Sequence, residues 1–275
     1  MAAALSVSCG KLDIVNMLLP LSTDVNKRVE QSLEWNKSAG TTTISVPEDS
    51  YRFYVCSDVH VEEARPARFA RMVETEKEDQ DAFFYQVLGD LLFETEHLDW
   101  ITDIVLDPAN DPSFVIAGNH DLFFDMWDTW RENFHTSTYY YFVKTPSATD
   151  LYIMLDSANG TLGEKQTAWL EEVIRENRPG CRHCIVSVHT NMFRTDTSQF
   201  PSTNFTLEET YRLTSLFSRS SVDLVLSGHD HVHDVSSFGG VTYITLDDIK
   251  DNTDHASYMT VDVGTGVEYA FVPLQ

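Results

Sequence analysis

The sequence predicts an α/β fold built on a sheet whose strands are mostly parallel. Two observations predict it: short apolar runs rich in β-branched and aromatic residues, and amphipathic helical stretches that lie between several of them. Strands that alternate with helices are typical of parallel sheets. The apolar runs lie at residues 52–58, 82–90, 113–121, 151–157, 184–190 and 222–230.

The other elements follow from the same patterns in chain order. Residues 24–36 place valine and leucine at helical spacing, and Gly40 ends this predicted helix. The strand-like run TTTISV comes next. Further helices are predicted over 64–78, 96–106, 164–177 and 207–219. After Gly228, closely spaced strand-like runs joined by short glycine turns predict an antiparallel addition to the sheet.

These elements suggest one main domain with a short N-terminal extension. We expect residues 1–50 to form a leader, a short helix and a first strand packed on the main domain, which spans residues 51–275. The hydrophobic content of 42% supports a sizeable packed core.

The net charge of −24 argues against nucleic acid as a partner. Binding to a nucleic-acid backbone depends on Lys and Arg that neutralise phosphates, and this chain has 19 of them against 43 acidic residues. A small anionic substrate stays compatible with this charge if bound metal cations recruit it. No run of 18 apolar residues occurs, so no transmembrane segment is predicted, and nothing in the sequence predicts an oligomeric state.

The four cysteines are too sparse for a disulfide scaffold. Cys181 and Cys184 form a single CxxC motif, for which inert thiols are favoured over a disulfide or a metal contact. The segment MAAALSVSCGK ends near Cys9 like a truncated lipoprotein signal, which would place the protein at the cell envelope. A disordered small-residue leader on a cytoplasmic protein is the equal alternative.

Polar residues follow five of the apolar runs, at the carboxyl ends where open α/β sheets place their ligand sites. Each motif alone has an ordinary explanation, because Gly, Asn and Asp form turns and a single histidine is often a core residue. The ordered set DxH, GD, GNHD, H and GHxH is far more specific. Its members are Asp58, His60, Asp90, Asn119, His120, Asp121, His189, His229 and His231.

These residue types predict a metal centre. Carboxylate oxygens, imidazole nitrogens and an amide oxygen suit Zn, Mn or Fe, and no thiolate lies among them. Two such ions about 3.5–4 Å apart can share a bridging hydroxide that attacks a phosphate ester in line. A carboxylate must lie between the two ions, and Asp90, in the middle of the set, is the natural candidate.

With these blocks in order, residues 51–273 resemble the calcineurin-like metallophosphoesterases. The resemblance implies a four-layer α/β/β/α sandwich of two mixed sheets, with a dinuclear centre at the carboxyl ends of the strands and Asp90 as the bridge. It implies these further ligands: Asp58, His60 and His231 for the first metal, and Asn119, His189 and His229 for the second. It also implies that His120 protonates the leaving oxygen, while Asp121 orients the His120 imidazole.

Departures from subfamily patterns narrow the expected function. Phe93 replaces the tyrosine of purple acid phosphatases, and GDLLFE lacks the arginine of the phosphoprotein phosphatases. The segment LYIMLDSANGTLGEKQTAWL resembles the middle of bacterial cyclic-nucleotide-phosphodiesterase-like and acid-phosphatase-like members. We therefore expect a hydrolase of a small phosphodiester or phosphomonoester. The alternatives are a non-catalytic metal-binding scaffold and a nuclease of the same family.

Two stretches are candidates for the substrate mouth. The run Phe123–Trp130 is interpreted first as a packed helix start and second as a source of one ring that lines the pocket. Residues 191–205 form a long polar connection that suits a lid, in which Arg194 is either solvated or a phosphate contact. Four further histidines are predicted to lie outside the ligand set: His97, His135, His233 and His255.

Overall fold

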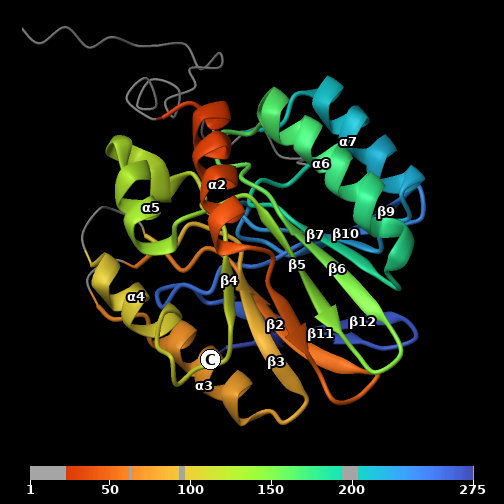
Figure 1. Cartoon of the computed structure of the whole chain (residues 1–275). Helices are drawn as coiled ribbons and strands as arrows, with labels where there is room; N and C mark the ends of the chain where they lie inside the picture. Colours follow the sequence, from red (N-terminus) through yellow and green to blue (C-terminus); the bar gives the residue numbers. More distant parts are fainter. Residues whose placement is uncertain (1–22, 62–63, 93–96, 194–203, 275) are drawn as a thin grey trace, which may run out of the picture.

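The computed structural model describes residues 23–61, 64–92, 97–193 and 204–274, and it contains two β-sheets stacked between layers of helices (Figure 1). The seven-stranded sheet has the order β1 (Thr43–Ser45), β5 (Tyr139–Lys144), β6 (Thr149–Met154), β7 (Cys184–Ser187), β8 (Leu224–Ser227), β10 (Val241–Thr245) and β9 (Asp234–Phe238). The five-stranded sheet has the order β12 (Val267–Pro273), β11 (Ser257–Val263), β2 (Tyr51–Cys56), β3 (Ala82–Val87) and β4 (Ser113–Val115).

Helices cover the outer faces of both sheets (Figure 1). The helices are α2 (Val25–Ala39), α3 (Ala67–Glu78), α4 (Leu98–Val105), α5 (Trp127–Phe134), α6 (Gly163–Asn177) and α7 (Leu207–Arg219), with short 3₁₀ helices η2 (His120–Asp125) and η3 (Arg178–Gly180). Side chains of α3, α4 and α5 pack on the five-stranded sheet, and those of α6 and α7 pack on the other. The predicted α/β fold class, a four-layer sandwich of two mixed sheets, is confirmed.

All six predicted apolar runs contain strands, but the sequence missed one strand and misplaced others. The strand β5 is not among the predicted runs, although it pairs with both β1 and β6. The predicted antiparallel pairing of the tail is confirmed for β9 with β10 and for β11 with β12, but the tail does not extend a single sheet. Instead β10 is parallel to β8, and β11 joins the other sheet beside β2. The sheet that each tail strand joins, and the direction in which it pairs, depend on contacts between distant segments of the chain. Local periodicity does not contain this information.

Buried aromatic side chains fill much of the space between the two sheets. Phe53 of β2 and Phe84 of β3 stack at a centroid distance of 4.9 Å, and Tyr152 of β6 meets both rings edge-on. All three side chains are fully buried. Burial of one large apolar side chain contributes about 1.5–3 kcal/mol, so this layer holds the two sheets in fixed register. Their carboxyl ends are thereby held in fixed positions around one site.

The thiols of the CxxC motif form no disulfide. Cys181 and Cys184 are both free, and Cys184 is buried at the start of β7. Burial raises the pKa of the Cys184 thiol far above its usual range, so it stays neutral. Cys9 lies outside the described residues. Among the described helices, none is long and apolar enough to cross a bilayer.

A buried ion pair links α2 to the loop that follows the strand β6. Arg28 Nε and Nη2 lie 2.8 and 2.9 Å from the two carboxylate oxygens of Asp156, and neither side chain is exposed. The next residue, Ser157, accepts hydrogen bonds from the backbone N–H groups of His189 and Thr190. The N-terminal helix is thus linked through one loop to a predicted metal ligand.

Replacing Arg28 with methionine is expected to destabilise the fold by about 3–5 kcal/mol, because it leaves the Asp156 carboxylate buried without its partner. Urea unfolding followed by circular dichroism measures this change. The double variant Arg28→Met/Asp156→Leu should recover much of the loss. Lys37→Met, which removes an exposed pair with Glu34, is the control and should change stability by less than about 1 kcal/mol. A loss of less than about 1 kcal/mol in the free energy of unfolding of Arg28→Met would contradict the prediction.

In the part of the chain that the structure describes, a buried carboxyl group without a charged partner lies on α3. Glu76 is fully buried, and within the described residues neither carboxylate oxygen has a hydrogen-bond partner. Burial raises the pKa of Glu76 to about 8, and the negative charges of Asp111 and Asp79 add to the shift. The folded protein therefore holds a proton that the unfolded chain releases near pH 4.5. Stability is lost as the pH rises between these two values.

Glu76→Gln is expected to remove this loss, because the amide stays neutral at all pH values. The melting temperature of the variant should exceed that of the wild type by about 5 °C or more at pH 8.5, and the two should converge below pH 4.5. Thermal unfolding at a series of pH values tests this. Glu74→Gln, an exposed change on the same helix, is the control. A difference that does not grow with pH contradicts the argument.

Candidate metal centre

The predicted ligands lie in loops that directly follow strands of both sheets. Neighbouring loops are tied by backbone hydrogen bonds, from Asp58 N to Gly89 O at 3.0 Å, from His60 N to Asp90 O at 3.0 Å and from Gly228 N to His189 O at 2.9 Å. The two sheets present these loops to one another at the same end of the sandwich. Residues from five separate chain segments therefore reach a single site.

Most of these loops are held in a strained backbone conformation. Five of the predicted ligands adopt a positive φ of 45–74°, a region that costs a non-glycine residue about 1–2 kcal/mol. Such residues cluster where function requires a particular side-chain direction. The five are Asp58, His60, Asp90, His229 and His231.

The first ligand set consists of Asp58, His60 and His231. His231 Nε2 lies 3.1 Å from Asp58 Oδ1 and 3.2 Å from His60 Nε2. His60 Nε2 lies 3.5 Å from the same Asp58 oxygen. The three ligand atoms lie within 4.8 Å of one another, close enough to hold one metal ion.

The second set gathers around His189 Nε2. This nitrogen lies 3.0 Å from Asn119 Oδ1 and 3.2 Å from His229 Nδ1. His189 Nδ1 lies 2.7 Å from the carbonyl oxygen of Leu88, to which it donates its proton, so Nε2 is the ring nitrogen that a metal ion would bind in place of a proton. Electron-rich atoms crowded in this way fit a bound cation.

One carboxylate joins the two sets. Asp90 Oδ2 lies 3.6 Å from His60 Nε2 and 3.4 Å from His189 Nε2, whereas Asp90 Oδ1 accepts a hydrogen bond from His120 N at 2.8 Å. Asp58 adds a further link, because its Oδ2 accepts a hydrogen bond from His229 N at 2.8 Å. The oxygen and nitrogen donors suit Zn, Mn or Fe, so the residues present fit the predicted ions.

Charge within the site is concentrated and balanced. Burial opposes ionisation of Asp58, yet the facing imidazole of His231 holds the pKa of that carboxyl well below its usual range. Burial likewise opposes charge on His189, but the carboxylates of Asp90 and Asp58 raise its pKa to about 10. The buried carboxylates therefore attract cations, and a metal ion would compete with protons for the same atoms.

His120 lies at the border of the ligand sets. Its ring meets the His60 ring edge-on at 4.6 Å and contacts the Phe123 ring at 4.6 Å. One nitrogen lies close enough to His60 and Asp90 to join a metal-binding group. The Phe123–Trp130 run fits both of its interpretations, because Trp127 and Trp130 are buried core residues while Phe123 contacts His120.

The Asp121 carboxylate accepts hydrogen bonds from the backbone of two neighbouring loops. Its Oδ1 accepts hydrogen bonds from Leu91 N and Leu92 N at 2.9 and 3.1 Å, and its Oδ2 accepts one from Gly118 N at 2.8 Å. These bonds hold the carboxylate against the backbone, and its role in orienting the His120 imidazole stays a prediction. The carboxylate is fully buried and fixes the backbone of the loops that carry Asp90 and Asn119.

The backbone at Gly118, the first residue of GNHD, packs so closely against Asp90 that only glycine fits there. A side chain there would collide with the Asp90 carboxylate and backbone. A side chain at Gly228 would collide with Ser57 and Asp58 in the same way. Both glycines allow a loop to approach a metal-binding carboxylate directly.

The four histidines predicted to lie outside the ligand set belong to none of the metal-binding groups found among the described residues. His97 stacks on Trp100 and His135 on Trp35, while His233 contacts Asp247 and His255 contacts Thr253. Arg194 and Phe93 lie outside the described residues, as does most of the predicted lid.

Sequence reasoning missed two residues beside His231. Lys250 Nζ lies 3.2 Å and Asp248 Oδ2 lies 3.6 Å from His231 Nδ1. Asp248 is buried, so it is placed to hold the His231 ring from behind. The signal was available, because Asp248 also follows an apolar run, the strand β10.

A family model for calcineurin-like phosphoesterases matches residues 51–233, more than half of the chain. The chain belongs to the calcineurin-like phosphoesterase family. The predicted family is therefore confirmed, and membership supports a metal-dependent phosphoesterase in general terms. No curated protein matches the chain at a significant level.

Solved structures share the fold of this phosphoesterase at low sequence identity. GAP50, the anchor in the inner membrane complex of Plasmodium, is 15% identical with a TM-score of 0.59, over 82% of this chain and 85% of that one. Purple acid phosphatase PPD1 from yellow lupin (Lupinus luteus) seeds is 13% identical with a TM-score of 0.60, and a putative 5'-nucleotidase from Staphylococcus aureus is 17% identical with 0.58. Both matches cover 82% of this chain. The chain therefore spans only about half of each of these two proteins, 52% of the phosphatase and 54% of the nucleotidase.

Proposed function

We propose that this protein hydrolyses a small phosphodiester or phosphomonoester at a dinuclear metal centre. The observation that carries the proposal is Asp90 Oδ2, which lies within 3.6 Å of one imidazole from each ligand set. Two Mn, Fe or Zn ions bound there would polarise the phosphate and activate a water molecule for in-line attack.

Within this proposal, His120 donates the proton to the leaving oxygen. Its backbone is held by Asp90 and its ring by contacts with His60 and Phe123, so the imidazole is fixed beside both ligand sets. General acid catalysis by a positioned imidazole typically contributes 10²–10⁴-fold. Phe123 adds an aromatic face next to this acid, against which the organic part of a small ester can pack.

The overall charge of −24 favours a small ester over a polynucleotide. A long anionic chain would meet repulsion over its whole length, whereas a small ester meets mainly the metal-binding pocket. The nuclease alternative is disfavoured for this reason.

The test is an activity screen of protein loaded with Mn, Fe or Zn, on bis-p-nitrophenyl phosphate, p-nitrophenyl phosphate and cyclic AMP. We expect metal-dependent turnover of at least one substrate and its loss on chelation. Metal content is measured in parallel by mass spectrometry. No turnover by protein with two bound ions would overturn the enzyme proposal and favour the non-catalytic scaffold.

A further inference from the structure

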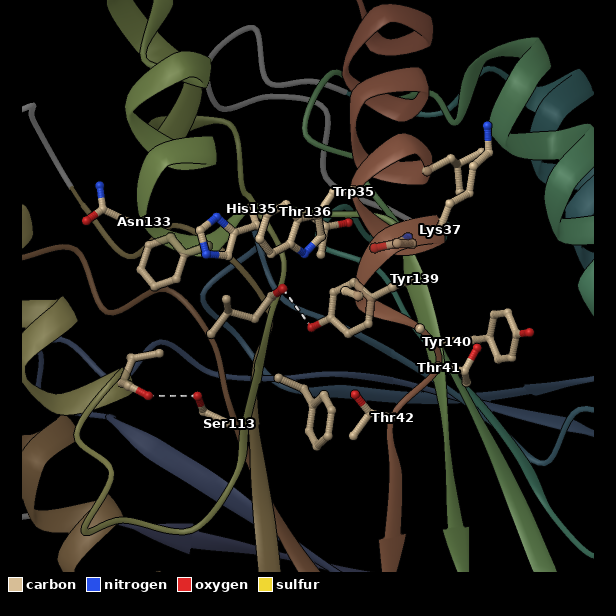
Figure 2. Close-up of a pocket in the computed structure, with 18 of the residues that line it drawn as sticks. Trp35, Lys37, Thr41, Thr42, Ser113, Asn133, His135, Thr136, Tyr139 and Tyr140 are labelled. Carbon is tan, nitrogen blue, oxygen red and sulfur yellow. Dashed lines mark hydrogen bonds between the residues drawn. The ribbon is translucent and has the colours of Figure 1, made fainter.

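A second cavity of about 610 Å³ lies away from the metal centre. It opens between the C-terminal ends of α2 and α5 and the strands β1 and β4, which form one edge of each sheet (Figure 2). None of the predicted metal ligands lines it. Its volume is in the range of small-molecule binding sites.

The cavity has no acidic side chain in its described lining, although the protein is strongly acidic, with 43 Asp and Glu residues. Lys37 is the one Lys or Arg among the lining residues, and its Nζ lies 2.9 Å from Glu34 Oε2. No carboxylate of the lining therefore favours a cationic ligand, and the ammonium group of Lys37 already has an acidic partner outside the cavity.

Aromatic rings form much of the wall. Trp35 is 42% exposed and stacks on His135 at a centroid distance of 4.0 Å, while Tyr139 lies in the middle of the cavity (Figure 2). Phe114, Tyr140 and Trp169 add further aromatic side chains. Such rings offer apolar faces against which the C–H groups of a flat ligand can pack.

Three polar side chains of the cavity, Asn36, Asn133 and Tyr139, each use a donor group in a hydrogen bond to the protein backbone. Asn36 and Asn133 donate their amide N–H groups to the carbonyl oxygens of Thr138 and Thr129, at 2.7 and 2.8 Å. Tyr139 donates its hydroxyl to Val115 O at 2.9 Å. These bonds fix the side chains and leave their oxygen lone pairs for a ligand, since no donor to them occurs among the described residues.

We propose that this cavity binds a neutral sugar unit. A sugar combines C–H faces, which match the aromatic wall, with several hydroxyl donors, which match fixed acceptors, and it has no charge. An organic cation would also be drawn to rings and acceptors, but it would meet Lys37 and no carboxylate. The proposal is independent of the phosphoesterase function.

Fluorine NMR of 5-fluorotryptophan-labelled protein tests the proposal. The chain has five tryptophans, and the resonance of Trp35 is assigned from its absence in Trp35→Phe. We expect maltose or cellobiose to shift the Trp35 signal saturably, with a Kd on the order of 1 mM, and to leave Trp100 unchanged. Saturation by choline without any sugar response, or no saturation by either, would overturn it.

Two variants sharpen the test. Trp35→Ala, followed through the Trp169 signal, should weaken sugar binding about 10-fold, because it removes an aromatic contact worth about 1–1.5 kcal/mol. Asn133→Leu should weaken it to a similar degree by removing an acceptor. Tyr211→Ala, which removes an exposed aromatic side chain on α7, is the matched control and should leave the Kd unchanged. Equal binding by all three variants would contradict the site.

Discussion

Asp90→Ala is expected to remove both metal ions and, with them, all measurable phosphoesterase activity. Asp90 supplies a carboxylate oxygen, Oδ2, that lies within 3.6 Å of an imidazole from each ligand set. Its other oxygen holds the backbone of His120. Loss of the side chain therefore separates the two sets and releases the loop that carries the proposed acid.

Comparison of Asp90→Ala with Asp90→Asn isolates the contribution of the negative charge to metal binding. The amide can still accept the hydrogen bond from His120 N, so the loop should keep its place while metal content falls. Asp103→Asn, which changes an exposed carboxylate on α4, is the control and should retain full metal content. Metal content is measured by mass spectrometry on protein purified with excess Mn or Zn. Two ions retained by Asp90→Ala would contradict a bridging role.

His120→Ala is expected to lower kcat by about 10²–10⁴ while the metal content stays unchanged. The physical reason is the loss of a proton donor for the leaving oxygen. The effect should depend on the leaving group. An ester of p-nitrophenol, which leaves readily as an anion, should lose at least ~10-fold less activity than an alkyl ester.

Metal analysis of the same variant decides between two roles for His120. The geometry also brings it within ligand distance of His60 and Asp90, so loss of a metal ion would identify it as a ligand. His255→Ala, which changes an exposed histidine outside the ligand sets, is the control for both measurements. An unchanged kcat for alkyl esters would exclude His120 as the general acid.

Much of the architecture could be predicted because its signals are local. The run Tyr51–Cys56 is apolar on both faces, and α7 carries a capping residue, Thr206, before its amphipathic pattern. The strand β5 was harder to predict, because two of its six side chains are buried and the others reach the surface in part or fully. The placement of β11 depends on its pairing with β2, some 200 residues earlier, and no local pattern contains that information.

The same distinction applies to the site. The ligands were predictable, since each follows an apolar run and the carboxyl ends of strands meet at one place. The hydrogen-bond partners of Asp121 could not be predicted, because three backbone N–H groups from two loops converge on its carboxylate only after folding. Asp248 follows the strand β10 and so carried the same local signal, but its contact with His231, like that of Lys250, depends on the pairing of β10 with β8.

By itself, therefore, the sequence determined the fold class, the family and the types of ligand, all of which are written in short motifs and their order. Only the tertiary structure decided that Asp90 faces both ligand sets, that Asp121 supports the backbone, and that an aromatic cavity without acidic side chains lies between the two sheet edges. These properties depend on distances between side chains far apart in the chain. Packing of the two sheets sets those distances, and a linear pattern does not specify them.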